Sequence, residues 1–414
     1  MPQTRAGHRS LDEYELMGHY DHWREDLALA RDLRLNAIRW GVPWYRVEPG
    51  PGSFDWSWTD RVIPYLVDEL GVTPIIDLMH YGCPLWLERE FAGPDYQRAV
   101  AAYATAFARR YHDLVHWYTP LNEPLVNALM CGQRGLWPPY MRGERGYVRV
   151  MLQLVNGILE TEEQIKEIDP DAVMVHVEAA GLTRAATPEL EPLAAEHRAR
   201  QFLAYDLLTG KVTPDHALYP WLMRCGASHR DLEAIRSRRI SPDVMGLNFY
   251  PQWSARELYL KRTGTLGNRA AEPDGTGFEE MVRAYFLRYH APIMITETSV
   301  IGNDAARAAW LDISLGAIRR LRSQELPIIG YTWFPMLTMI DWRYRFGARP
   351  TDAYRIELGL YRLRENPVRR WEPSPLVERW QWHTMHTAEA VGPQPGVQDC
   401  LDTTLKRRVT RTDR

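Results

Sequence analysis

Two glutamates, each at the end of a short apolar run, are the residues of this sequence best suited to chemistry. The run at 117–124 reads WYTPLNEP and carries Glu123, and the run at 292–298 reads PIMITET and carries Glu297. Proline after Glu123 stops a strand from continuing its hydrogen-bond ladder. A single glutamate after a strand is most often a solvated loop residue. Two of them delivered by two strands can share one cleft, where one acts as nucleophile and the other as general acid and base.

Composition favours a neutral or small ligand. The chain has 414 residues with 45% hydrophobic content, enough for a large core, and its formal charge is −3 from 50 basic and 53 acidic residues. Such a balance provides no overall field for nucleic acid or anionic lipid, so we expect neither nucleic acid nor membrane as a partner. Sixteen Trp and 21 Tyr against nine Phe favour surfaces that are half apolar and half hydrogen-bonding, as sugar rings are.

The cysteines give no sign of a metal centre or of disulfides. Cys83, Cys131, Cys225 and Cys400 are widely separated, with neither a CxxC pair nor a histidine at zinc spacing. We expect reduced thiols and no metal or cofactor. The start of the chain has no apolar core of a signal peptide, and no run is long enough to span a bilayer, so a cytoplasmic location is the expectation.

Helical and strand-like patterns alternate along the chain. Strands are predicted at 36–42, 74–79, 116–121, 172–177, 244–249, 293–296 and 328–333. Helices are predicted at 20–33, 58–70, 97–111, 147–168, 192–208, 229–238, 278–289, 304–322 and 375–390. Such alternation is typical of parallel strands with covering helices.

The fold class expected is α/β, a (β/α)₈ TIM barrel. No glycine-rich phosphate loop follows any strand, which argues against a dinucleotide-binding doubly wound sheet. In a barrel, functional side chains gather at the carboxyl ends of the strands. The side chains at or near predicted strand ends are Arg39, His80, Asn122, Glu123, Asn248, Tyr250, Glu297 and Trp333.

Seven predicted strands leave the first strand of an eight-stranded barrel unlocated. Only residues 1–19 precede the first helix, and their polar composition fits a buried strand poorly. Either an irregular first strand lies there, or the sequence begins after it. We expect one barrel domain over 1–390, a fraying tail over 391–414, and a long loop at 264–277 that could act as a lid.

Three motifs of this sequence resemble those of a known enzyme family. Leu121-Asn122-Glu123-Pro124 resembles the acid/base motif of family 1 glycoside hydrolases, Ile295-Thr296-Glu297 the start of their nucleophile motif, and His80-Tyr81 their strand-three His-Trp element. Segments 38–40, 246–250 and 330–333 extend the similarity. With one strand unlocated, Glu123 falls on strand four and Glu297 on strand seven, as in that family.

The resemblance implies roles for individual residues. Glu123 would be the general acid/base and Glu297 the nucleophile, with Arg39 and Tyr250 as hydrogen-bond partners of Glu297. The remaining residues implied in sugar binding are His80, Tyr81, Asn122, Asn248, Trp333, Asp341 and Trp342, with Trp333 as the floor of the site.

Three departures from the family pattern concern the sugar specificity. The first-strand Gln that normally meets the sugar in that family has no visible counterpart in this sequence. Thr298-Ser299 replaces the usual Asn-Gly after the nucleophile, and Asp341-Trp342 replaces the usual Glu-Trp. Because these positions meet the outer hydroxyls of the sugar in that family, the identity of the sugar stays open while the chemistry is expected to persist.

The expected function is a retaining β-glycosidase (EC 3.2.1 type) that hydrolyses a small β-glycoside in carbohydrate metabolism by double displacement. This mechanism needs the two carboxyl groups about 5–5.5 Å apart, with Glu297 ionised and Glu123 protonated. A transglycosylase with the same intermediate and a catalytically weak sugar-binding or regulatory barrel remain alternatives. An isomerase of phosphorylated metabolites would need a glycine-rich anion site or metal carboxylates, and the sequence shows neither. Oligomeric state is open.

Overall fold

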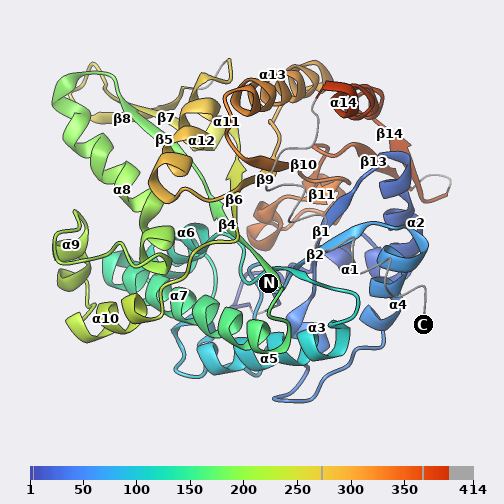
Figure 1. The fold of residues 1–414 in the computed structure, drawn as a ribbon, viewed down its shortest axis with the longest axis horizontal. Helices are drawn as coiled ribbons and strands as arrows, with labels where there is room; N and C mark the ends of the chain where they lie inside the picture. The colour runs from blue at the N-terminus through green and yellow to red at the C-terminus, as the bar shows by residue number, and fades with distance from the viewer. Residues whose placement is uncertain (3, 272–273, 366–367, 391–414) are drawn as a thin grey trace.

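Seven parallel strands form one curled sheet at the centre of the molecule (Figure 1). This computed structural model describes residues 1–2, 4–271, 274–365 and 368–390, without the side chains of 387–390. The strand order among them is β1-β2-β3-β4-β6-β9-β10. Their bounds are β1 Ala37–Gly41, β2 Thr73–Asp77, β3 Trp117–Thr119, β4 Val173–Ala179, β6 Val244–Phe249, β9 Ile293–Thr298 and β10 Ile328–Trp333. All seven predicted strands are confirmed; the predicted tail, 391–414, lies outside the described residues.

Helices follow the strands along the chain and cover the outside of the sheet (Figure 1). The longer ones are α2 (His19–Asp32), α5 (Tyr96–Tyr111), α7 (Gly143–Ile168), α8 (Glu191–Leu208), α10 (His229–Ser237), α12 (Thr276–Tyr289), α13 (Asp304–Ser323) and α14 (Leu376–Ala390). The helix predicted at 58–70 is α4 (Thr59–Pro64) continued by the π-helical η1 (Tyr65–Glu69). The alternating α/β pattern predicted from the sequence is therefore confirmed.

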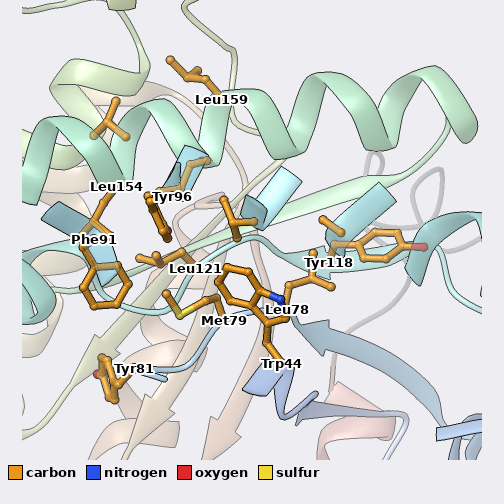
Figure 2. Packing of buried hydrophobic residues seen from close by; sticks show 14 of the residues in the cluster. Trp44, Leu78, Met79, Tyr81, Phe91, Tyr96, Tyr118, Leu121, Leu154 and Leu159 are labelled. Atoms are coloured by element: carbon orange, nitrogen blue, oxygen red, sulfur yellow. The ribbon is translucent and has the colours of Figure 1, made fainter. Parts of the chain in front are cut away.

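Burial explains why these segments form strands. Every residue of β6 and of β9 is buried, as expected for parallel strands covered on both faces. Side chains on one face of the sheet, such as Ile75 and Trp117, form a shared cluster, while Tyr118 faces the other way. Figure 2 shows part of the outer core, where Tyr118 and Leu121 pack among side chains that include Leu154 of α7.

The barrel is open between its two end strands. β1 and β10 are the ends of the sheet and do not pair with each other, and each is mostly half-buried where β6 and β9 are fully buried. As predicted, no strand forms in the described part of residues 1–19. The short helix α1 (Glu13–Leu16) instead contacts the end of β1 and β11 (Met339–Ile340): the Tyr14 hydroxyl donates to the carbonyl of Gly41 (3.0 Å), and the Glu13 carboxylate accepts from the Ile340 amide.

The prediction of a long loop at 264–277 is wrong in part. β8 (Leu266–Ala270) pairs antiparallel with β7 (Ala255–Leu260), and β7 pairs with β5 (Leu182–Ala185), so a small three-stranded sheet lies beside the barrel. The segment was predicted as a loop because it is rich in glycine and polar residues. The hairpin forms nevertheless, because the backbone hydrogen bonds between its strands do not require apolar side chains. Residues 272–273 lie outside the described residues.

Three further expectations concern cysteines, membrane and metals. Cys83, Cys131 and Cys225 are free thiols, as expected, and Cys400 lies outside the described residues. Among the described helices, none has the length and apolar composition needed to span a bilayer. In the same part of the chain, no group of three or more His, Cys, Asp and Glu side chains is placed to hold a metal ion.

Candidate active site

Glu123 lies just beyond β3 and is held by its backbone. The backbone of Glu123 adopts a left-handed conformation (φ 48°, ψ 72°), and its amide donates to the carbonyl of Val177 on β4 (3.0 Å). The buried side-chain amide of Asn127 donates to the carbonyls of Asn122 (2.8 Å) and Glu123 (3.0 Å). Left-handed backbone is rare for residues other than glycine and persists only where the surroundings hold it. These bonds are what hold the turn that presents Glu123.

Glu297 is the fifth residue of β9, and donors hold both of its carboxylate oxygens. The Arg39 guanidinium donates through Nη2 to Oε1, and the Tyr250 hydroxyl donates to Oε2 (2.6 Å). Glu297 is only 4% exposed. A buried carboxylate is strongly stabilised by a cationic donor, because Coulomb attraction replaces the lost hydration.

Arg39, on β1, links three strands. Its Nη1 donates to Asp77 Oδ2 at the end of β2 (2.6 Å) and to Asn122 Oδ1 (3.1 Å), while Nη2 contacts Glu297. Asp77 Oδ2 also lies 2.9 Å from Nδ1 of His80. The fork of the guanidinium is suited to such a bridge, since its donors have a fixed planar geometry.

The carboxylate of Glu123 is held by two neutral side chains. Asn248 Nδ2 donates to Oε1 (2.9 Å), and the Tyr81 hydroxyl donates to Oε2. Asn248 is itself fixed, because its Oδ1 accepts from the Thr296 hydroxyl (2.7 Å), one residue before Glu297. Glu123 and Glu297 therefore belong to one hydrogen-bond network at the same end of the barrel.

Burial determines the protonation of the groups around the two glutamates. Burial, with the negative charge of Glu123 adding to it, raises the pKa of the Tyr81 and Tyr250 phenols well above their ordinary value, so both are neutral donors. Behind Glu123 lies the buried Glu178 of β4, whose carboxylate accepts from the amides of Leu125 and Ala179. Burial first, and then the charge of Glu123, raises the pKa of Glu178 well above its usual range.

The structure brings together most of the residues singled out from the sequence. Those joined by hydrogen bonds in one network are Arg39, His80, Tyr81, Asn122, Glu123, Asn248, Tyr250 and Glu297. The ring of Trp342 packs edge-to-face against two rings: its centroid lies 5.8 Å from that of Tyr81 and 4.8 Å from that of Trp137. Trp342 thus borders the network.

Two predicted sugar-binding residues have protein partners. Trp333 is buried, and its indole donates to the carbonyl of Leu358 (3.0 Å). The carboxylate of Asp341 accepts from the backbone amide (2.8 Å) and the guanidinium Nε (2.7 Å) of Arg343. Their roles toward a sugar stay predictions.

Sequence reasoning missed three residues that position the network: Asp77, Asn127 and Thr296. Asp77 carried a usable signal, because it is a charged residue at the end of an apolar strand, like the residues that were identified. Asn127 lies four residues after Glu123, and nothing in that spacing predicts a contact with two carbonyls. Thr296 looked like an ordinary strand residue.

Comparison with known proteins decides the family. The profile described as "Glycosyl hydrolase family 1" matches residues 13–261, more than half of the chain. This chain belongs to glycosyl hydrolase family 1. The matched region contains Glu123 and ends before β9, so Glu297 lies outside it. As a member of the family, the protein is a glycoside hydrolase, and the resemblance found in the motifs is confirmed.

The similarity to curated family members is distant but extensive. A β-glucosidase A of Thermotoga maritima is 23% identical over 362 residues, covering 80% of each chain. A bifunctional β-D-glucosidase/β-D-fucosidase of Bifidobacterium breve is 38% identical over 124 residues, 26% of each chain. These relatives support β-glycoside hydrolysis in general for this family 1 enzyme.

Solved structures confirm the fold class. The family 1 β-glucosidase of Thermotoga maritima superposes with a TM-score of 0.75 at 18% identity, covering 91% of this chain and 88% of that one. The (β/α)₈ barrel architecture predicted from the sequence is therefore the fold of this glycoside hydrolase, with the irregular first-strand region described above.

Proposed function

We propose that this family 1 glycoside hydrolase is a retaining β-glycosidase that acts on a small β-glycoside through a covalent glycosyl-enzyme. The observation that carries the proposal is the different surroundings of the two glutamates. Glu297 is held by a guanidinium and a phenol, whereas the partners of Glu123 are a neutral amide and a neutral phenol. A cationic donor suits a nucleophile that must be ionised when it attacks, and neutral partners suit a group that must gain and lose a proton.

The reaction then proceeds in two steps. In the first, Glu297 attacks the anomeric carbon, and the bond to the leaving oxygen breaks as Glu123 transfers its proton to that oxygen. In the second, Glu123, now a carboxylate, takes a proton from a water molecule that attacks the same carbon and releases Glu297. Two displacements at one carbon give net retention of the β configuration.

Arg39 and Tyr250 position the nucleophile in this proposal. Together they hold both oxygens of Glu297, so the carboxylate cannot rotate freely as the sugar approaches. His80, half-exposed beside Asn122, is proposed as a contact to sugar hydroxyls.

The sugar unit is proposed to be glucose-like, because the relatives are named β-glucosidases and a β-D-glucosidase/β-D-fucosidase. Two local features favour looser recognition of its outer hydroxyls. The Thr298 hydroxyl donates to the carbonyl of Phe249 (2.6 Å) and accepts from the indole of Trp310 (2.9 Å), so it faces away from the network. Asp341 is occupied by Arg343.

The test is a panel of 4-nitrophenyl α- and β-glycosides with the wild-type enzyme and the variants Glu123→Gln and Glu297→Gln. We expect release of nitrophenol from β-glycosides only, and a loss of at least about 10²–10⁴-fold in each variant, the range of general acid–base and nucleophilic contributions. Turnover of α-glycosides, or near wild-type activity in both variants, would refute the proposal.

A further inference from the structure

Tyr81 lies against Glu123 rather than in open space at the barrel end. Its hydroxyl donates to Glu123 Oε2 and accepts from the side-chain amide of Asn122 at 2.8 Å. Because Asn122 Nδ2 is a donor only, the phenolic hydrogen is directed at the carboxylate. Asn248 holds the other oxygen of Glu123, so the plane of the carboxyl group is set by Tyr81 and Asn248 together.

The ring of Tyr81 is fixed by its neighbours. It meets Trp137 at 5.0 Å and Trp342 at 5.8 Å between centroids, and His80 edge-on at 4.5 Å. The side chain is only 6% exposed, and its backbone is left-handed (φ 65°). A bulky residue in that conformation is held there by its surroundings, and aromatic edge contacts orient a ring specifically. The hydroxyl is therefore preorganised toward Glu123.

We propose that Tyr81 is a positioning residue for the acid/base: it orients Glu123 and stabilises the negative charge that forms on Glu123 as the leaving oxygen is protonated. This inference rests on the proposed function, in which Glu123 is the acid/base. It differs from the role in sugar binding expected from the sequence, because the hydroxyl of Tyr81 has both of its hydrogen-bonding functions engaged by Asn122 and Glu123.

The chemistry predicts a dependence on the leaving group. The proton on Glu123 moves to the leaving oxygen while the bond from that oxygen to the anomeric carbon breaks, and Glu123 becomes a carboxylate. A hydroxyl donor stabilises the carboxylate more than the neutral acid, so its removal weakens the acid. An alcohol leaving group needs this proton, whereas 2,4-dinitrophenolate leaves as a stable anion and hardly needs it.

The experiment compares Tyr81→Phe with wild type on three β-glycosides of one sugar, with 2,4-dinitrophenyl, phenyl and methyl leaving groups. Phenylalanine keeps the ring and removes only the hydroxyl. We expect kcat/KM to fall about ten- to a hundredfold for the phenyl and methyl glycosides, the effect of one hydrogen bond to a charged group, and less than about threefold for the dinitrophenyl glycoside. An equal loss on all three, or no loss on any, overturns the proposal.

Tyr118→Phe is the matched control. Tyr118 is a buried tyrosine of the neighbouring strand whose hydroxyl donates to the carbonyl of Val115 (3.0 Å) and has no bond to the network. This substitution should leave the ratio of the three kcat/KM values unchanged. If the control changes the ratio as Tyr81→Phe does, the effect is one of general packing and the proposal is overturned.

A double-mutant cycle separates this inference from the proposed function. If Tyr81 acts through Glu123, adding Tyr81→Phe to Glu123→Gln should cause no further leaving-group-dependent loss. A further selective loss in that background would mean that Tyr81 acts independently of Glu123 and would overturn the inference. If Glu123→Gln alone is not selective for poor leaving groups, it is the role of Glu123 in the proposed function that fails.

Discussion

At the scale of the residue, the partners of the two glutamates make their roles distinguishable. The guanidinium of Arg39 contacts Glu297, while Glu123 has Asn248 and Tyr81. The distinction matters because both groups are glutamates at similar depth, 4% and 6% exposed. Their burial and residue type are alike, so the difference in charge of their neighbours is the physical basis for assigning nucleophile and acid/base.

Small-anion rescue tests this assignment. Glu297→Gly should nearly abolish hydrolysis, and added azide or formate should restore part of the turnover, because a small anion fits the space of the missing carboxylate beside Arg39. The glycosyl azide formed should have inverted configuration, as read by NMR. Glu123→Gly should instead yield a retained glycosyl azide from activated substrates. The reverse pattern would mean that the two roles are exchanged.

At the scale of the element, the short segment after β2 carries a buried acid. Glu90, in a 3₁₀ turn (Glu90–Ala92), is 3% exposed. Burial raises its pKa from 4.5 to about 8; the Met1 amino group and the Arg345 guanidinium, which face it, oppose this rise. The folded protein therefore holds this proton more tightly than the unfolded chain does.

This element predicts a pH-dependent stability. Below pH about 4.5, Glu90 is protonated in both the folded and the unfolded protein and does not lower the free energy of unfolding. As the pH rises from 4.5 to about 8, the unfolded chain releases the proton first, so the free energy of unfolding falls across this window. Glu90→Gln should match wild type in Tm near pH 5 and exceed it by at least about 3 °C near pH 9. Thermal denaturation at several pH values measures this, with the exposed Glu88→Gln as control. A constant difference would contradict it.

At the scale of the whole molecule, the barrel has an open seam between β1 and β10. An edge strand has hydrogen-bond partners on one side only and opens more readily than an interior strand. β6, paired on one side with β4 and on the other with β9, is the interior reference.

Hydrogen exchange followed by mass spectrometry should detect this seam. We expect the amides of β1 and β10 to exchange at least about tenfold faster than those of β6, because opening of an edge disrupts fewer hydrogen bonds. Equal protection of all three strands would show that α1 or another segment closes the seam as effectively as a strand does.

The sequence predicted the features that follow from the spacing of apolar residues or from the position of a polar residue at the end of a strand. Parallel strands buried on both faces appear as apolar runs, and polar residues at their ends meet in the fold, which is why Arg39, Asn248 and Glu297 were identified together. The contact of Tyr81 with Glu123 was not predicted, because it depends on left-handed backbone at both residues. The β7–β8 hairpin was missed because Gly267 and Asn268 have low strand propensity, although backbone hydrogen bonds to β7 hold this segment as a strand.

Trapping of the glycosyl-enzyme tests the central claim most directly. A 2,4-dinitrophenyl 2-deoxy-2-fluoro-β-glycoside, of the sugar preferred in the panel, slows both steps but keeps a good leaving group, so the intermediate accumulates. Mass spectrometry should show one added sugar per chain, located after digestion on Glu297 and absent in Glu297→Gln. An enzyme that hydrolyses the parent β-glycoside yet forms no adduct, or carries it on another residue, would contradict the account.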